Sequence, residues 1–363
     1  MRSSSRRALA VLSSNMWRDA CIIQLVGPCI SITIVLKTGP QGDVLAMTDA
    51  PTVPTDIPEL SSSTNIVAIA EGWSADRKFR VLSNGGATWM LRLSDIRHRE
   101  KKRFEYECLC KAEEMNLPTP RPVSFGECDD GAQNYLLLTW VEGVELREVL
   151  AKASRSKQYA LGFKAGKLLR QLQDIPVPHL SKSWEQMFLG QLEERGQRLA
   201  ETCIDLPERD AFLMHIEQYR HLLAERPLKF VHGDYHVGNL LVTSNGELAS
   251  IDFDRCRVAD PWDDHKRVVW DLEASTAFAS GRLNGYFEDK IPEDFWALLA
   301  AYCASNAIGS IAWAVPFGDE QIEHHLHQAR RLFESYKGMR RIVPEWYCPH
   351  GRHGACPARP LRV

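Results

Sequence analysis

A short β-type segment interrupts two long stretches of helical periodicity in this chain of 363 residues. It contains two apolar runs, 240–242 and 248–251, on either side of Asn245-Gly246. Asn-Gly between such runs is a strong signal for a tight β-hairpin turn. The hairpin predicts that Asn239, before its first strand, and Asp252, after its second, lie at the same open end.

A loop rich in polar residues precedes this hairpin and reads His232-Gly233-Asp234-Tyr235-His236-Val237-Gly238-Asn239. A turn, a helix cap and a surface carboxylate would explain these residues singly. The joint pattern His-x-Asp-x4-Asn, with Asp252 following 252 − 239 = 13 residues later, is rare by chance. Asn and Asp oxygens at one hairpin mouth suit Mg²⁺, which prefers hard oxygen ligands. Asp234 is placed to accept a proton or hydrogen bond from a hydroxyl, as phosphoryl transfer requires.

These motifs resemble the catalytic and metal-binding motifs of the aminoglycoside phosphotransferase and choline kinase superfamily, relatives of protein kinases. The resemblance covers residues 64–347. It implies an α+β, two-lobed protein-kinase-like fold with a small β-rich N-lobe and a larger helical C-lobe. It also implies an enzyme, a small-molecule kinase that uses ATP or GTP with Mg²⁺. By similarity, Asp234 is the catalytic aspartate, Asn239 and Asp252 are magnesium ligands, and His232 and His236 support the loop.

The same resemblance places residues that would bind the nucleotide phosphates. Ser74 lies in the segment 71–78, where the family has its phosphate-covering loop, although a plain hairpin explains this segment equally well. Arg92 occupies the position of the phosphate-binding lysine. Arginine here is a departure, because the two side chains are not interchangeable, and an exposed strand arginine is the alternative. Glu107 is the candidate for the helix glutamate that pairs with Arg92, with Glu105 as the second choice and a solvated helix face as the alternative.

The hinge and the acceptor side are placed in the same way. Thr139, Trp140 and Val141 would form the hinge whose backbone reads adenine. Asp260, Asp263 and Asp264 lie just past the expected metal site, and Glu273 follows further along the next helix. Of these, Asp263, Asp264 and Glu273 are candidates for binding a cationic acceptor, although the acidic run could equally cap the helix start.

The acceptor is expected to be the hydroxyl of a small molecule. Asp260-Pro261 arrives only eight residues after Asp252, which leaves no room for the peptide-docking segment of a protein kinase. An aminoglycoside or similar antibiotic, a macrolide, choline and a sugar all remain open. A nucleotide-binding pseudokinase or regulatory module is the alternative function, favoured weakly by the departure at Arg92.

Composition narrows the partners. The formal net charge of 44 − 47 = −3 gives no overall attraction to nucleic acid. The apolar run 22–36 contains Gln, Gly and Pro and is too short to span a bilayer, so we expect no stable membrane span, and an N-terminal targeting segment is the less favoured alternative. Ten scattered cysteines are interpreted as reduced thiols of a cytoplasmic protein. The oligomeric state stays open.

The sequence predicts four parts. Residues 1–63 form a poorly ordered extension and linker, 64–141 the nucleotide-binding N-lobe, 142–347 the catalytic and acceptor-binding C-lobe, and 348–363 a tail. The tail residues Cys348, His350, His353 and Cys356 are all metal-ligand types, but their spacing matches no standard zinc site. A disordered tail is therefore preferred to a metal site.

Overall fold

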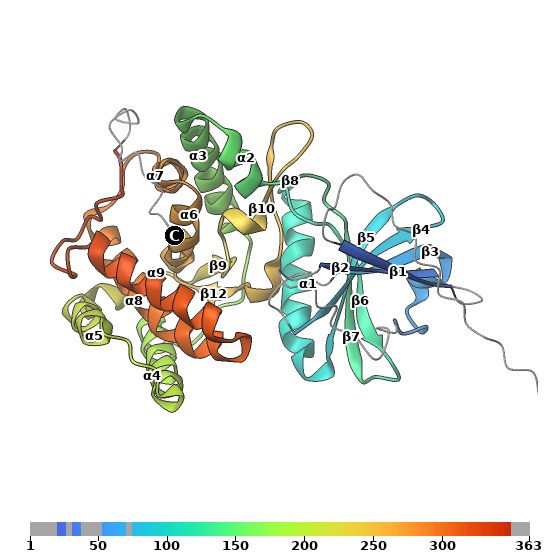
Figure 1. Cartoon of the computed structure of the whole chain (residues 1–363), viewed down its shortest axis with the longest axis horizontal. Coiled ribbons are helices and arrows are strands. Elements are labelled where there is room, and N and C mark those ends of the chain that lie inside the picture. The colour runs from blue at the N-terminus through green and yellow to red at the C-terminus, as the bar shows by residue number, and fades with distance from the viewer. Residues whose placement is uncertain (1–19, 27–30, 38–52, 70–74, 350–363) are drawn as a thin grey trace, which may run out of the picture. The chain divides into compact units, whose positions relative to one another are not determined.

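The computed structural model describes residues 20–26, 31–37, 53–69 and 75–349 (Figure 1). The chain divides into two compact units, one made of Met1–Glu113 with Pro120–Val141 and the other of Glu114–Thr119 with Glu142–Val363. The first unit holds the large sheet and the second holds most of the helices. The expected α+β class is therefore confirmed.

The first unit is built on a seven-stranded sheet with the order β1-β2-β3-β4-β5-β7-β6. Neighbouring strands are antiparallel, except that β2 and β3 run parallel. The strands are β1 (Ala20–Val26), β2 (Ser31–Lys37), β3 (Ser63–Ile69), β4 (Arg77–Ser83), β5 (Thr88–Asp95), β6 (Pro122–Cys128) and β7 (Gln133–Thr139). Helix α1 (Arg99–Glu114) follows β5.

The core of the first unit begins upstream of the expected boundary at Thr64. Ile57 and Leu60 are buried and pack with Phe79 and Leu91 of β4 and β5. Two strands, β1 and β2, also lie within the segment expected to be an extension and linker. The prolines and small polar residues that suggested a linker conceal these apolar anchors, so the boundary at residue 64 was wrong.

The second unit contains eight helices within the described residues. They are α2 (Leu146–Lys152), α3 (Arg155–Leu172), α4 (Trp184–Thr202), α5 (Arg209–Gln218), α6 (Val268–Ala274), α7 (Thr276–Phe287), α8 (Glu293–Ala314) and α9 (Asp319–Ser335). Five short strands form two small sheets, β11-β10-β8 and β12-β9. They are β8 (Val144–Glu145), β9 (Lys229–Val231), β10 (Leu240–Val242), β11 (Leu248–Ser250) and β12 (Arg257–Ala259).

Helix α8 is a central element of the core of the second unit. Together with the turn that follows it, Glu293–Phe317 is the one described helix long and apolar enough to cross a membrane by length and composition, but 67% of its apolar window is buried within the protein. Its apolar side chains, among them Leu299, Tyr302 and Ile308, belong to the large hydrophobic cluster of this unit. The apolar character of α8 is therefore that of a core helix.

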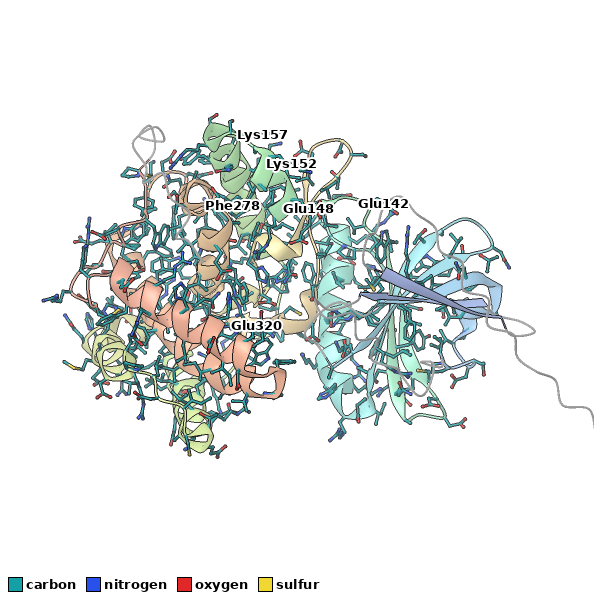
Figure 2. The ribbon with its side chains drawn as sticks, viewed as in Figure 1. Glu142, Glu148, Lys152, Lys157, Phe278 and Glu320 are labelled. Carbon is teal, nitrogen blue, oxygen red and sulfur yellow. The ribbon has the colours of Figure 1, made fainter. Side chains whose placement is uncertain are left out.

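Helices α3 and α7 touch backbone to backbone. Gly162 and Gly166 of α3, and Gly281 and Gly285 of α7, each lie so close to the opposite helix that an added Cβ would come within 2.0–2.2 Å of a carbonyl oxygen. The carbonyl facing Gly162 belongs to Phe278, which Figure 2 labels on α7. Such an approach is open only to glycine, so these four positions fix α7 against α3.

A methyl group at this contact should destabilise the protein. We expect Gly166→Ala to lower the free energy of unfolding by about 3 kcal/mol or more, because two backbones must separate. Gly190→Ala on α4 is the matched control, since nothing lies within 4 Å of its added Cβ. There, alanine should be neutral or stabilise by about 0.5–1 kcal/mol. Urea denaturation measures both, and equal effects would contradict the close contact.

Candidate active site

The predicted hairpin is present. Strands β10 and β11 pair with Leu240 opposite Ser250, and the N–H of Ile251 donates to the carbonyl of Asn239 at 3.0 Å. Asp252 follows with φ of 62°, in the left-handed region that non-glycine residues seldom adopt. The structure thus brings Asn239 and Asp252 to one end of the hairpin, as the sequence predicts.

His232 ties the loop to this hairpin. It is completely buried, and its Nε2 lies 3.1 Å from the carbonyl oxygen of Ile251. The N–H of Asp234 donates to Nδ1 at 3.3 Å, so we assign the ring proton to Nε2. One imidazole therefore fixes both the backbone at Asp234 and the residue before Asp252.

Asp264 also holds the loop, through hydrogen bonds to its backbone. Its buried carboxylate accepts hydrogen bonds from the N–H groups of His232 and Gly233, at 2.9 and 2.6 Å. Gly233 has φ of 81°, and an added Cβ there would lie 2.1 Å from the carbonyl oxygen of Arg255. Position 233 thus requires glycine twice over, by its backbone angle and by its space.

The interpretation of Asp263 and Asp264 as acceptor-binding residues was wrong. Asp263 is 2% exposed and pairs with Lys266 at 2.5 Å and with Arg257. The capping alternative is confirmed for Asp260, which accepts the N–H of Trp262 at the start of this 3-10 segment, and Asp263 and Asp264 lie in its first turn. A sequence shows an acidic run but not that each carboxylate turns inward to a different partner.

Asp271 and Arg282 complete the support of the loop and were missed by sequence reasoning. Both are 0% exposed and pair at 2.7 Å. Asp271 accepts the N–H of Val237 at 2.9 Å, and Arg282 donates to the carbonyl of Tyr235 at 2.8 Å. Burial raises the pKa of Asp271 to about 6, against the lowering effect of Arg282. The only sequence signal was a charged residue at each position inside an apolar helix.

The carboxyl group of Asp234 is held on one side. Its Oδ1 lies 2.9 Å from Arg267 Nε, 3.7 Å from His236 Nε2 and 3.9 Å from Arg255 Nη1. Burial raises the pKa of Asp234, but the neighbouring cations, Arg267 foremost, bring it down to about 2. Burial also lowers the pKa of His236 to about 3, so this ring is neutral near pH 7. Asp234 is therefore ionised, with its Oδ2 free of hydrogen-bond partners among the described residues.

The donor set at the hairpin mouth fits a magnesium ion. Asn239 donates from Nδ2 to the carbonyl of Asp234 at 2.9 Å, which turns its Oδ1 outward as a hard oxygen without a described partner. No group of three or more His, Cys, Asp or Glu side chains among the described residues could hold a metal alone. Two protein oxygens, from Asn239 and Asp252, match Mg²⁺ sites that phosphate oxygens complete.

Arg92 lies in a buried ionic cluster of the first unit. It donates to Glu105 at 2.8 Å and to Asp76 at 2.7 Å, and Lys102 donates to Asp76 at 2.5 Å. Arg92, Lys102 and Glu105 are each no more than 4% exposed, whereas Glu107 is exposed. The choice of Glu107 was wrong and the second choice, Glu105, is the partner, because helix residues two apart do not share a face.

The other predicted nucleotide residues have different outcomes. Ser74 lies outside the described residues. In the predicted hinge, the N–H of Thr139 donates to the carbonyl of Arg121 at 2.8 Å and the N–H of Trp140 to that of Thr88 at 2.9 Å. These two donors are thus occupied by the sheet, and Val141 ends the first unit.

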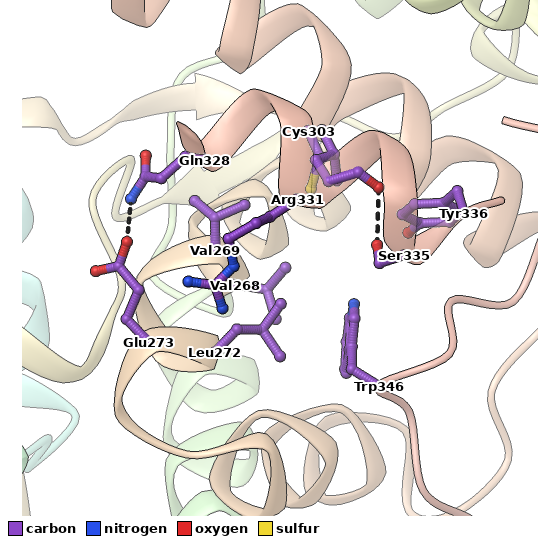
Figure 3. A pocket seen from close by; sticks show the side chains of 11 residues that line it. Val268, Val269, Leu272, Glu273, Cys303, Gln328, Arg331, Ser335, Tyr336 and Trp346 are labelled. Atoms are coloured by element: carbon purple, nitrogen blue, oxygen red, sulfur yellow. Dashed lines mark hydrogen bonds between the residues drawn. The ribbon is translucent and has the colours of Figure 1, made fainter. Parts of the chain in front are cut away.

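Glu273 lines a narrow pocket between α6, α8 and α9 (Figure 3). Its carboxylate accepts a hydrogen bond from Gln328 Nε2 at 2.6 Å and lies 3.4 Å from His324 Nε2. The pocket has room for about one or two water molecules. An amino sugar does not fit there, and no described contact joins Glu273 to Asp234, so the structure offers no support for direct acceptor binding by Glu273.

The C-terminal residues lie mostly outside the described part of the chain. His350, His353 and Cys356 are among these, so the metal question for the tail stays open. Cys348 forms a disulfide bond, which departs from the expectation that all cysteines are reduced. Six others, Cys108, Cys110, Cys128, Cys203, Cys256 and Cys303, are free thiols.

The ionic cluster gives a matched test. Glu105→Gln should lower the free energy of unfolding by about 3 kcal/mol, because Arg92 and Lys102 lose a buried counter-charge. Glu107→Gln, two residues away and exposed, should change it by less than about 0.5 kcal/mol. Urea denaturation followed by circular dichroism measures both. If both substitutions had the same effect, the pairing of Arg92 with Glu105 would lose its support.

Comparison with known proteins adds a family and a fold. The profile of the phosphotransferase enzyme family matches residues 65–300. No sequence among curated proteins matches the chain. A solved complex of a thermostable mutant of the aminoglycoside phosphotransferase APH(4)-Ia with ADP and hygromycin B is 16% identical, with a TM-score of 0.58 over 76% of this chain and 95% of that one.

Two further solved structures are similar. The GDP and kanamycin complex of an APH(2″) enzyme is 16% identical, with a TM-score of 0.58 over 75% of this chain and 94% of that one. Amicoumacin kinase hAmiN with AMP-PNP, Ca²⁺ and Ami is 16% identical, with a TM-score of 0.56 over 76% and 90%. At these identities the likeness establishes the fold, and the expected two-lobed kinase-like fold is confirmed.

Proposed function

We propose that this chain, which belongs to the phosphotransferase enzyme family, transfers the γ-phosphoryl group of ATP, with Mg²⁺, to a hydroxyl group of a small molecule. The solved neighbours named above are kinases of small molecules. The observation that carries this proposal is the carboxyl group of Asp234. One oxygen is held by Arg267 and the other has no described partner. That arrangement suits a group that must orient an incoming hydroxyl.

Each residue of the loop has a separate task in this reaction. Asp234 accepts the hydrogen bond of the acceptor hydroxyl, whose oxygen forms a bond to the γ-phosphorus as the bond to the leaving diphosphate breaks. The hydroxyl proton is taken up by Asp234 or by the transferred phosphoryl group. Asn239 and Asp252 would hold Mg²⁺, which supplies neutralisation of the phosphate charge when it is bound.

On the nucleotide side, Arg92 and Lys102 are the cations that we propose to face the phosphates. Arg92 stands where the family has lysine, and Lys102 brings a second positive charge to the same cluster. The N–H of Val141 is the hinge donor that we propose for adenine, since the N–H groups of Thr139 and Trp140 are already bonded. Solved neighbours bind ADP, AMP-PNP or GDP, so GTP is the alternative donor.

The acceptor is a hydroxylated small molecule. The neighbours named above act on or bind hygromycin B, kanamycin and amicoumacin, which makes an antibiotic a reasonable class to test. Two carboxylates that had favoured a polycationic amino sugar as the acceptor, Asp263 and Asp264, are buried in other contacts. They therefore no longer support that class of acceptor.

A nucleotide-binding module without turnover is the second candidate. The observation that favours it is Asp76, which pairs with both Arg92 and Lys102 and so neutralises the cations expected to meet phosphate. The ordered loop around Asp234, with Asn239 and Asp252 at one hairpin mouth, weighs against it.

Substitution of Asp234 separates these two functions. Asp234→Asn should lower phosphoryl transfer at least about 100-fold, because the amide no longer accepts the hydroxyl proton, while ATP and Mg²⁺ bind as before. ADP release measures turnover, first with water as the acceptor and then over a panel of hydroxylated compounds, and calorimetry measures ATP binding. Asp210→Asn, an exposed residue on α5, is the control, and chelation of Mg²⁺ should abolish turnover. Unchanged turnover in Asp234→Asn would refute the mechanism, and ATP binding without turnover in the wild type would favour the module.

A further inference from the structure

A ring of contacting side chains connects Asp234 with residues of helices α6, α8 and α9. On one side, His236 lies 3.7 Å from Asp234 and stacks on Trp270 of α6, with ring centres 5.7 Å apart. On the other side, Arg255 lies 3.9 Å from Asp234 and 5.8 Å from the ring centre of Trp313 of α8. All of these residues belong to the second unit. Each indole ring thus contacts a side chain that lies next to the proposed catalytic carboxylate.

His325 of α9 completes this ring of contacts, because it touches both tryptophans. Its imidazole meets both indoles edge to face, with ring centres 5.9 Å from Trp270 and 5.6 Å from Trp313. His325 is 4% exposed, whereas both tryptophans are partly exposed. Trp270 also packs against His236 and His324, and Trp313 packs against Phe317. The exposed parts of the two indoles are the surface that could meet another planar ring.

A hydrogen-bond chain fixes the protonation of His325. Gln328 donates from Nε2 to Glu273 at 2.6 Å, so its Oε1 faces His325 Nδ1 at 3.1 Å and accepts a hydrogen bond from Nδ1–H (the Gln328–Glu273 bond is drawn in Figure 3). With the proton on Nδ1, Nε2 is a hydrogen-bond acceptor. Burial lowers the pKa of His325 to about 4, which keeps the ring neutral.

That acceptor atom has no partner. Nε2 of His325 is buried and makes no hydrogen bond among the described residues. Buried nitrogen atoms are nearly always paired, because leaving one unpaired is unfavourable. Glu273 and Gln328 therefore keep Nε2 of His325 as an unsatisfied acceptor in contact with two tryptophans.

The charges around Asp234 argue against a polycation. Arg267 and Arg255 both face its carboxylate, and the carboxylates of Asp263, Asp264 and Asp271 are each no more than 2% exposed. Cations near aromatic rings instead favour an electron-rich ring in the same place.

We propose that Trp270, His325 and Trp313 form the acceptor subsite, and that it takes a planar, electron-rich ring carrying one hydrogen-bond donor, such as a phenolic hydroxyl. The ring lies against the indoles and donates to Nε2 of His325, while another hydroxyl of the same molecule reaches Asp234. This inference rests on the proposed function, since it names the class of acceptor for that site. Glu273 acts in it as an orienting residue, two hydrogen bonds away from the acceptor.

Three probes distinguish the contribution of the aromatic ring to binding from that of its hydroxyl donor. They are 4-hydroxyphenyl β-glucoside, 4-methoxyphenyl β-glucoside and methyl β-glucoside, which share their sugar hydroxyls. Calorimetry with the full-length protein, Mg²⁺ and AMP-PNP should show the hydroxyphenyl probe binding about tenfold more tightly than the methyl probe. The methoxyphenyl probe, which cannot donate, should bind about fivefold more weakly than the hydroxyphenyl probe.

Variants assign these differences to residues. Trp313→Leu should remove the preference for the two aryl probes over the methyl probe. His325→Phe should remove the preference for hydroxyl over methoxyl, and Gln328→Met, which frees the His325 tautomer, should reduce that preference. Tyr219→Leu replaces a partly exposed ring of the same unit that contacts His215, and should leave all preferences unchanged. Melting curves confirm that each variant is folded.

The outcomes are separable. Equal binding of the three probes, no binding of any of them, or preferences that survive Trp313→Leu and His325→Phe would each overturn the subsite. Kanamycin is included as a polycation, and tighter binding of kanamycin than of the aryl probes would also overturn it, pointing instead to exposed carboxylates of α9 such as Glu320 (Figure 2). Asp234→Asn should keep the probe preferences, so failure of phosphoryl transfer and failure of the subsite are distinguished.

Discussion

Two backbone N–H groups donate to one buried carboxylate, and the loop that carries Asp234 depends on that interaction. The N–H groups of His232 and Gly233 cannot reach water, and an unpaired buried backbone donor is strongly disfavoured. Asp264 satisfies both. Asp271 satisfies Val237 further along the same loop, and Arg282 neutralises Asp271 while bonding Tyr235. The loop is thus an irregular segment held almost entirely by side chains from the helical unit.

Much of this site could be predicted from the sequence, because its signals are local. The Asn245-Gly246 turn and the apolar runs beside it dictate a hairpin, and a hairpin brings the residues before and after it together. Arg92 with a helix glutamate was also within reach, but the choice between Glu105 and Glu107 depends on the rotation of α1, to which the sequence pattern gives only a weak guide. The roles of Asp234, Asn239 and Asp252 in catalysis and metal binding stay predictions.

What could not be predicted is the direction in which charged residues face. Asp263 and Asp264 are adjacent in an acidic run that resembles a surface for cations, yet each meets a different buried partner. In a 3-10 segment successive side chains point about a third of a turn apart, so neighbours separate into different environments. The surroundings of His325 are equally hidden in the sequence, because only the packing of α9 shows that this ring is buried against two indoles.

The backbone contact between α3 and α7 divides the helical unit into a fixed part and an adaptable part. Four glycines leave no side-chain layer between those helices, so their interface cannot be repacked by exchanging side chains, and α7 carries Arg282 to the loop that holds Asp234. Helix α9 meets its neighbours through ordinary side chains, including the rings around His325. If the proposed subsite holds, substitutions on α9 can change the acceptor that is recognised while α3 and α7 keep the loop of Asp234 in place.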